Sequence, residues 1–210
     1  YGWKFHLLVI GPFGLKRSEN GKIRFYFEKR FALWGGVGGT IPQDANPDKI
    51  KEWAMILLAG PMASIVLGSG FLTAGLFSES LFLILLGAMS LGMGTVSALP
   101  LPIKTGILYT DGGRVMRIRK GGQEAREEAA MLDLVICECT GASFTDVNDS
   151  FIETLINAKD YSIRYYGYYY KYKFHKAQNN LAEANFAISE MESIKDKVPA
   201  VIVSDCKYEQ

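Results

Sequence analysis

The chain has 210 residues, 49% of them hydrophobic and 21% charged, with a formal net charge of +1. A charge this close to zero gives no argument for a nucleic-acid partner, and the 3 cysteines do not make a disulfide framework. The charges are unevenly distributed, since Glu79 is the only charged residue between Glu52 and Lys104. The length suits one or two domains, and the composition divides the chain into residues 1–50, 51–120 and 121–210.

Residues 1–50 are predicted to be a β-rich, membrane-associated segment. Phe5–Ile10 is a short apolar run. The next two runs, Phe13–Arg17 and Lys22–Glu28, flank Asn20-Gly21, which is a strong signal for a β-hairpin. Apolar and polar residues alternate in the second run, so one face of the hairpin is expected to be apolar and the other wet or interfacial.

The segment Phe31–Ile41 is rich in glycine and almost free of charge. Glycine removes side chains where another backbone can approach closely. Two interpretations stay open here: a flexible loop, or an edge strand that accepts a substrate segment by strand addition. Under the second interpretation Gly36 and Gly38 are candidate substrate-binding residues.

Two long apolar segments follow, Trp53–Phe77 and Leu81–Leu99. As helices they would measure about 37 Å and about 28 Å, long enough to span a bilayer. Because only Ser78–Ser80 separates them, we expect a tight antiparallel hairpin. Basic residues precede and follow the hairpin but are missing from its tip, so the positive-inside rule places both flanks in the cytoplasm. The sequence thus predicts a multi-pass protein of the cell membrane, with the lipid bilayer as a partner.

Small residues recur in the first apolar segment at Gly60, Ser64 and Gly68. Such stripes let helices approach closely in lipid. Pro61 removes a backbone hydrogen bond and is expected to bend the helix near its start.

The second apolar segment runs into Pro100 and Pro102, which end the regular helix. Lipid tolerates irregular backbone only where protein or a water-filled cavity covers it. Asp111-Gly112-Gly113 comes soon after, and a carboxylate just beyond a membrane-length apolar block is a functional-site candidate. The other interpretation is a turn that closes a helix at the membrane surface.

Three motifs together, Ala59–Ser64, Leu99–Pro102 and Asp111–Gly113, resemble the site-2 protease family of intramembrane zinc metalloproteases. The resemblance covers residues 1–120. It implies that Asp111 is the third zinc ligand and that a β-structured element lies near the active site. Family members often carry asparagine at the positions of Ser64 and Ser97, where its amide would hold the substrate backbone. Serine can also donate and accept hydrogen bonds, but its side chain is shorter. The candidate residues are Asp111 for the metal, Gly36, Gly38, Ser64, Ser97 and Pro100 for substrate binding, and Gly60, Pro61, Gly112 and Gly113 for the structural motifs.

The first two zinc ligands of that family are histidines of an HExxH helix. Zinc hydrolysis needs three protein ligands and an open position for water, yet the chain has only His6 and His175 and therefore lacks the motif. His6 stands alone in an apolar strand, where a histidine is usually structural. Either the HExxH helix lies upstream of Tyr1, or the protein is a degenerate relative. Gly2-Trp3-Lys4 is typical of the exit from such a helix, which favours the first alternative.

From Gly121 onward the sequence predicts a cytoplasmic helical domain. The expected helices are Gln123–Cys139, Thr145–Ala158, Asp160–Lys176 and Asn179–Ile194. The last two form an αα-hairpin, whose many tyrosines are expected to pack in its core rather than to form a ligand cage. A protein partner of this domain is conceivable, although the sequence does not identify one.

The sequence therefore predicts a mainly α, polytopic membrane protein: a transmembrane helical hairpin, preceded by a small β-hairpin and edge strand and followed by a cytosolic α-helical domain. The predicted function is part of an intramembrane zinc metalloprotease that hydrolyses peptide bonds of membrane-associated protein substrates. The alternative is a noncatalytic membrane scaffold or a transporter-like fragment. That alternative needs no missing residues, but it offers no reason for Asp-Gly-Gly after a broken helix.

Overall fold

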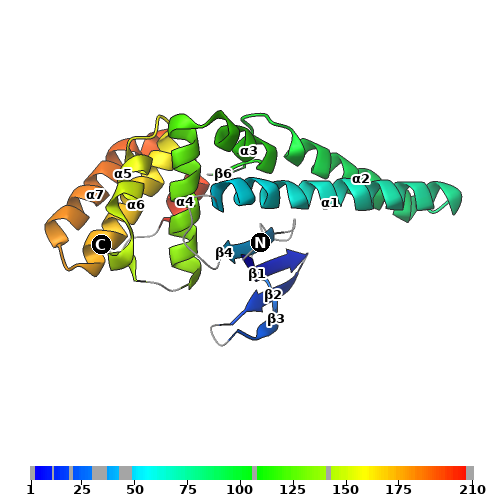
Figure 1. The fold of residues 1–210 in the computed structure, drawn as a ribbon, viewed down its shortest axis with the longest axis horizontal. Coiled ribbons are helices and arrows are strands. Elements are labelled where there is room, and N and C mark those ends of the chain that lie inside the picture. The colour runs from blue at the N-terminus through cyan, green and yellow to red at the C-terminus, as the bar shows by residue number, and fades with distance from the viewer. Residues whose placement is uncertain are drawn as a thin grey trace. The chain divides into compact units, whose positions relative to one another are not determined.

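The computed structural model describes residues 3–10, 12–18, 21–29, 37–42, 49–105, 108–140 and 143–206. The fold is mostly helical with a small antiparallel sheet near its N-terminus, which confirms this part of the predicted fold class (Figure 1). The chain divides into two compact units, Tyr1–Trp53 and Ala54–Gln210.

The first unit contains a four-stranded antiparallel sheet with the strand order β3-β2-β1-β4. Its strands are β1 (Trp3–Ile10), β2 (Phe13–Arg17), β3 (Ile23–Phe27) and β4 (Val37–Pro42). The predicted hairpin is present, and Gly21 adopts the left-handed conformation at its turn with φ of 79°. Asn20 lies outside the described residues.

The β2–β3 hairpin has one strongly apolar face. Its register pairs Phe13 with Phe27 and Leu15 with Phe25, so these four side chains share a face. Phe13, Phe25 and Phe27 are 56%, 66% and 59% exposed. The predicted apolar face therefore exists, and in the structure it is open.

Helices α1 (Lys49–Phe77) and α2 (Leu81–Ala98) form the predicted antiparallel hairpin. Their backbones meet at glycines. A Cβ atom on Gly87 would lie 2.8 Å from the carbonyl oxygen of Gly68, and one on Gly94 would lie 2.9 Å from that of Pro61. Among the described residues a Cβ atom on Gly60 would meet nothing within 4 Å, so Gly60 does not share this contact. The contacting positions are seven residues apart on each helix, Pro61 and Gly68 on α1 and Gly87 and Gly94 on α2. Residues seven apart stay on one face of a helix, because a heptad drifts by only about 20°.

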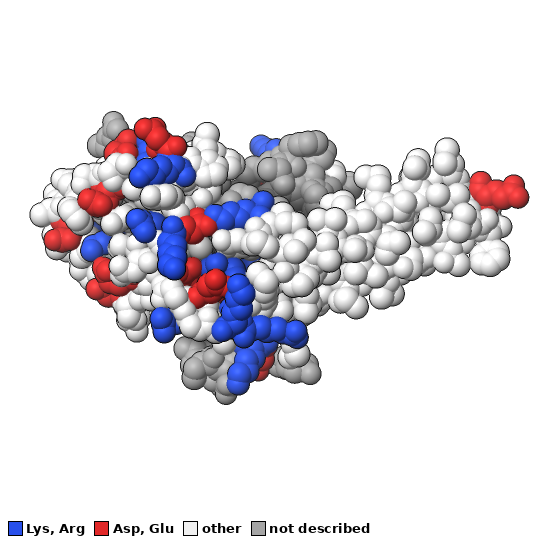
Figure 2. Space-filling view, turned by 90° about the horizontal axis from the view of Figure 1, so that it is seen from above, with Lys and Arg blue, Asp and Glu red and all other residues white. Residues whose placement is uncertain are grey.

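Both hairpin helices are long and apolar enough to cross a membrane. In the most apolar 18-residue stretch of each helix, only 17% of α1 and 11% of α2 is buried. A core helix of a soluble protein would be mostly buried. Figure 2 shows most of the hairpin surface without charged residues. Among the described side chains, the charges lie in the first turn of α1, at Lys51 and Glu52, and at Glu79 in the connection between the two helices.

The chain after α2 is helical except for a short β-ladder. The elements are β5 (Lys104–Thr105), β6 (Leu108–Tyr109), α3 (Asp111–Lys120), α4 (Gly122–Thr140), α5 (Asp149–Ile156), α6 (Tyr161–Ala177), α7 (Leu181–Ile194) and α8 (Ala200–Asp205), with 3-10 turns at Phe144–Asp146 and Lys195–Lys197. The helix predicted over Thr145–Ala158 begins later than expected, because the Asn148 side chain caps α5 by accepting a hydrogen bond from the Ser150 amide.

The core of this helical region contains large side chains. Leu155, Ile152 and Tyr170 are almost completely buried in one cluster, and Tyr165 packs with Met191 in another. The prediction that tyrosines pack in the core is confirmed for Tyr165 and Tyr170. Helices α5, α6 and α7 lie side by side in Figure 1.

Candidate functional site

The strongest candidate site lies where α2 ends and α3 begins. Asp111 is the first residue of α3, and Ser97 lies in the last turn of α2. The Ser97 hydroxyl donates a hydrogen bond to Oδ2 of Asp111 at 3.0 Å. Oδ1 of the half-buried Asp111 carboxylate accepts no hydrogen bond from the described residues. The site therefore offers one oriented carboxylate, one oxygen of which is not bonded by any described residue.

The segment between the two helices returns the chain to the end of α2. Leu101 donates a backbone hydrogen bond to the Leu99 carbonyl and Ile103 donates one to the Leu101 carbonyl, both at 2.8 Å. These three-residue turns centre on Pro100 and Pro102, which explains how the prolines bend the path. The Thr110 amide then bonds to the Ile103 carbonyl at 2.9 Å, just before α3.

Gly112 and Gly113 fit α3 against this broken helix end. A Cβ atom on Gly112 would collide with the carbonyl oxygens of Ala98 and Leu99, and one on Gly113 would lie 2.5 Å from that of Leu101. Since backbone atoms cannot give way as side chains do, both positions require glycine. The sequence left two interpretations open for Asp111-Gly112-Gly113, a functional site or a turn that closes a helix, and the structure places these residues in the first turn of helix α3. Packing accounts for the two glycines, so the metal hypothesis depends on Asp111.

The electrostatic surroundings of Asp111 are mixed. Burial raises the pKa of its carboxyl group, while the hydrogen bond from Ser97 and the positive charge of Arg114 act in the opposite direction, and the net pKa is above the usual value. Its place in the first turn of α3 favours the charged form through the helix dipole. A partly desolvated carboxylate with a specific partner is typical of functional sites, although structural sites also show it.

A buried cluster of ion pairs fixes α3 to α4. Arg114 Nε lies 2.8 Å from Glu128, and Arg117 lies 2.8 Å from Glu128 and 2.6 Å from Glu127. All four side chains are less than a tenth exposed. The Arg117 guanidinium also lies 4.6 Å from the ring centre of Tyr109. This cluster was not predicted, because Arg114 and Arg117 were expected to be among the basic residues that follow the hairpin at the membrane surface. The sequence signal for it is the pair of arginines three apart together with the adjacent Glu127 and Glu128.

The other candidate residues lie in several places. Pro61 and Ser64 face α2 in the helix contact, where the Ser64 carbonyl accepts a hydrogen bond from the Ser90 hydroxyl at 3.0 Å. Gly60 and Pro100 are exposed.

In the first unit, Gly38 is an exposed residue of the edge strand β4, and Gly36 lies outside the described residues. His6 is at an irregularity in the β1–β4 register, between the pairs made by Phe5 and Leu7. Burial and the charge of Lys16 lower its pKa.

A zinc site would need more donors than the described residues bring together. Among them, no three His, Cys, Asp or Glu side chains are close enough to hold a metal ion. Asp111 fits the role of one oxygen ligand, because Ser97 orients its carboxylate and Oδ1 is not bonded by any described residue. The other donors would have to come from elsewhere.

Comparison with family models, with curated proteins and with solved structures finds no match to this chain. Function therefore has to be inferred from the residues and their geometry.

Proposed function

We propose that the chain is part of an intramembrane zinc metalloprotease of the site-2 type, which hydrolyses peptide bonds of membrane-associated protein substrates. The observation that carries this proposal is the hydrogen bond between Ser97 and Asp111, which holds a carboxylate with one free oxygen at the end of an apolar helix. The order of the sequence motifs around this pair supports the same class of protein.

In this proposal α1 and α2 cross the bilayer, and the helices after them lie in the cytoplasm. The exposed apolar surface of the hairpin supports membrane placement. The orientation rests on basic residues such as Lys16, Lys22 and Arg119, which flank the hairpin. Arg114 and Arg117 do not contribute to this argument for the orientation, because both are buried and form ion pairs.

Asp111 would supply one of three zinc ligands, and two histidines of an HExxH helix outside these 210 residues would supply the others. Zinc, when bound, lowers the pKa of its water and polarises the scissile carbonyl. Ser97 would orient the carboxylate through its hydrogen bond, as groups next to metal ligands commonly do. Gly112 and Gly113 would hold the first turn of α3 against the end of α2.

The substrate would pair with the free edge of β4. Among the described strands β4 pairs only with β1, so its other edge presents unpaired backbone groups. A Cβ atom on Gly38 would meet nothing within 4 Å among the described residues, so the face of the sheet is open at this position. Gly36, Ser64 and Pro100 stay in the proposal as further substrate contacts. Replacing Gly36 and Gly38 with valine should block cleavage without preventing assembly, and unchanged cleavage would count against pairing at this edge.

The main test is the variant Asp111→Asn in the full-length polypeptide. Asparagine keeps the shape of the side chain but removes the charge that a zinc ligand needs, so we expect loss of bound zinc and of cleavage with membrane insertion preserved. Asp133→Asn is the matched control, since it changes another partly buried carboxylate, on α4. Ser97→Ala should weaken zinc binding by about 10–100-fold. Full zinc content and full activity in Asp111→Asn would contradict the proposal.

A noncatalytic membrane scaffold or transporter-like fragment is the second candidate. One observation favours it: the close approach of α3 to the end of α2 gives Gly112 and Gly113 a structural role without any chemistry. A scaffold predicts that the full-length wild-type protein, purified with zinc present, contains none. The zinc content of the wild type therefore separates the two candidates before any substrate is known.

A further inference from the structure

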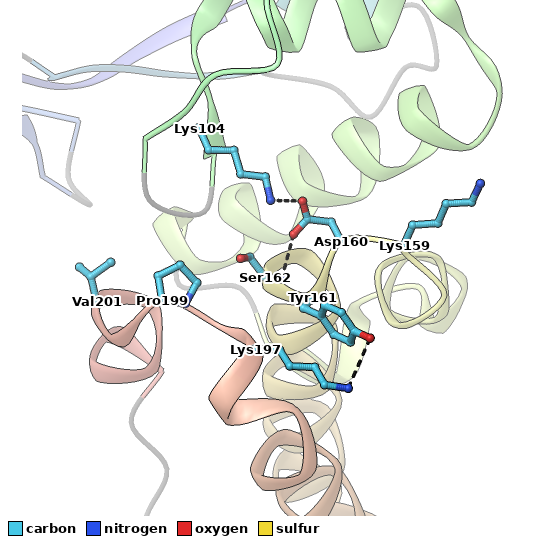
Figure 3. A pocket seen from close by; sticks show the side chains of 8 residues that line it. All are labelled: Lys104, Lys159, Asp160, Tyr161, Ser162, Lys197, Pro199 and Val201. Carbon is cyan, nitrogen blue, oxygen red and sulfur yellow. Dashed lines mark hydrogen bonds and ion pairs between the residues drawn. The ribbon is translucent and has the colours of Figure 1, made fainter.

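An open cleft of about 530 Å³ in the second unit brings together residues that lie far apart in the sequence. Its walls come from β5, from the start of α6 and from the chain after α7, and they include Lys104, Asp160 and Lys197. Figure 3 shows Lys104 directed at the Asp160 carboxylate, while Lys197 bonds to the Tyr161 hydroxyl. Lys104 and Asp160 therefore form a connection between β5 and α6 in the wall of this cleft.

The Asp160 carboxylate holds three elements together. Its Oδ1 accepts the Ser162 amide at 2.9 Å and so caps α6, while its Oδ2 forms the ion pair with Lys104 and accepts the Tyr109 hydroxyl at 3.2 Å. Lys104 on β5 and Tyr109 on β6 stand directly opposite each other in the short β-ladder. One carboxylate of the helical region thus bonds to both strands of the ladder.

This carboxylate is charged and partly withdrawn from water. Burial alone would raise the pKa of Asp160, but Lys104 and the backbone amides of Ser162 and Ile163 outweigh burial and lower it. The Asp160 side chain is 17% exposed and that of Lys104 is 34% exposed. Fully exposed ion pairs contribute little, whereas a partly buried carboxylate with several donors forms stronger, charge-assisted hydrogen bonds. The contact is therefore strong enough to restrain the ladder.

The ladder leads directly into the candidate metal ligand. Thr110 alone separates the end of β6 from Asp111, and it is 8% exposed. Its amide bonds to the Ile103 carbonyl and its carbonyl accepts the Arg114 amide, both at 2.9 Å. Thr110 thus joins the ladder to the first turn of α3, so a displacement of the ladder would also displace Asp111.

The ring of Tyr109 links the same ladder to the buried ion pairs. The Arg117 guanidinium lies 4.6 Å from the ring centre, and Glu127 and Glu128 hold that guanidinium from α4. These pairs fix the body of α3, while Asp160 holds the ladder that precedes α3. The two restraints act on different sides of Asp111 in the sequence.

We propose that Asp160 is a positioning residue for Asp111. Through Lys104 and Tyr109 it makes the placement of the Asp111 carboxylate depend on the folded helical region, and above all on the start of α6. The helices after α4 thereby take part in building the site, although they lie outside the stretch that resembles a protease. The effect on zinc rests on the proposed function, whereas the restraint of the segment around Asp111 does not.

The variants separate this role from the capping of α6. Asp160→Asn removes the charge but leaves a side chain that can still cap the helix, and Lys104→Gln removes the other half of the ion pair. Lys104→Arg keeps the charge and should restore wild-type behaviour. Asn148→Ala is the matched control, because Asn148 caps α5 and makes no hydrogen bond to the ladder among the described residues.

The first measurement is hydrogen–deuterium exchange over residues 108–114 in the zinc-free, full-length protein in detergent. Asp160→Asn and Lys104→Gln should each speed exchange of the Thr110 and Arg114 amides by about tenfold, the effect of losing one hydrogen bond to a charged group. Lys104→Arg and Asn148→Ala should exchange like wild type. Circular dichroism measures unfolding, and Asp160→Asn should be no less stable than Asn148→Ala.

The second measurement is zinc affinity, by competition with a chromophoric chelator. Asp160→Asn and Lys104→Gln should weaken it by about tenfold, as is common for groups that hold a metal ligand in place. Asn148→Ala should leave it unchanged. A purely structural role of Asp160 would lower the stability without this difference from the control.

Wild-type exchange in both Asp160→Asn and Lys104→Gln, or equally fast exchange in Asn148→Ala, overturns the proposal. Faster exchange with unchanged zinc affinity also overturns it, because Asp111 would then be placed without Asp160. Lys104→Gln tests the same ion pair if Asp160→Asn fails to fold. A wild-type protein that binds no zinc contradicts the protease proposal, and the exchange measurement alone then decides whether Asp160 restrains the start of α3.

Discussion

The α1–α2 hairpin and the helices after it pack in opposite ways. In the hairpin the closest contacts are between glycine backbones, while large side chains such as Leu85 and Met89 point outward and are 55% and 65% exposed. In the helical region the large side chains are inside, and Leu155 and Tyr170 are 0% and 1% exposed. The second arrangement follows from burial of apolar surface away from water. The first is expected where the surroundings are themselves apolar.

The junction between the two regions packs in a third way, with both close backbone contacts and buried ion pairs. Residues of α3 contact the end of α2 through Gly112 and contact α4 through the buried ion pairs of Arg114 and Arg117. Asp111, the first residue of α3, therefore lies at the connection between the exposed apolar hairpin and the helices that enclose a buried core.

The largest effect is expected in this junction, for Glu128→Ala. Glu128 pairs with both Arg114 and Arg117, and its removal leaves buried positive charges without their main partner. Breaking such a pair costs about 3–5 kcal/mol. Denaturation in mild detergent, followed by circular dichroism, measures the loss. A change below about 1 kcal/mol would show that water reaches these arginines and that the junction is loose.

The same substitution in the two regions tests the comparison directly. Leu155→Ala should lower the free energy of unfolding by about 2–5 kcal/mol, because it leaves a cavity in a closed core. Leu85→Ala should change it by less than about 0.5 kcal/mol, because Leu85 is exposed and, under the proposed membrane placement, would have the same apolar surroundings before and after helix separation. Equal losses at the two sites would mean that the hairpin is packed like a soluble core.

Glycine substitutions within α2 separate its two faces. Gly87→Leu would drive a side chain into the backbone of Leu72 and Gly68, and overpacking of this kind costs about 1–3 kcal/mol. Gly92→Leu is the matched control on the same helix, because a Cβ atom there meets nothing within 4 Å among the described residues. Thermal unfolding in detergent measures both. Equal tolerance of leucine at the two positions would contradict the described contact.

The smallest effect is a gain, expected for Tyr165→Phe. The Tyr165 hydroxyl is buried and has no hydrogen-bond partner among the described residues, so its removal should stabilise the protein by about 1 kcal/mol. Burial, together with the charges of Cys206 and Glu192, raises the pKa of Tyr165 to about 12.

A raised pKa means that the folded state favours the neutral phenol of Tyr165. Its contribution to stability is therefore complete below the ordinary pKa of about 10 and is lost as the pH rises through about 12. Unfolding measured between these limits should depend less on pH in Tyr165→Phe than in wild type. A destabilised variant with an unchanged alkaline profile would indicate a partner for the hydroxyl.

Elements with strong local signals were predictable from the sequence. The two uncharged apolar segments gave the α1–α2 hairpin, and the alternation around Gly21 gave the β2–β3 hairpin. Helix α3 was not predicted, because Gly112 and Gly113 have poor helix propensity. They are tolerated there for a reason that no local pattern contains, namely contact with carbonyl groups of residues 98–101.

The candidate site was predictable only in part. Asp111 was identified from its position after the apolar segment, and Ser97 was named as a substrate contact, whereas in the structure it bonds to Asp111. The ion pairs between α3 and α4, and the cleft lined by Lys104 and Lys197, bring together residues that lie apart in the sequence. Pairings of this kind depend on how the helices pack, which the pattern of single segments does not specify.

The central claim, that Asp111 is a zinc ligand, is tested most directly by zinc X-ray absorption on the full-length protein in detergent. The claim predicts bound zinc with oxygen and nitrogen neighbours at about 2.0–2.2 Å, and loss of the metal or of one oxygen neighbour in Asp111→Asn, with Asp133→Asn unchanged. A wild-type protein that holds no zinc, or an identical spectrum in wild type and Asp111→Asn, would contradict it.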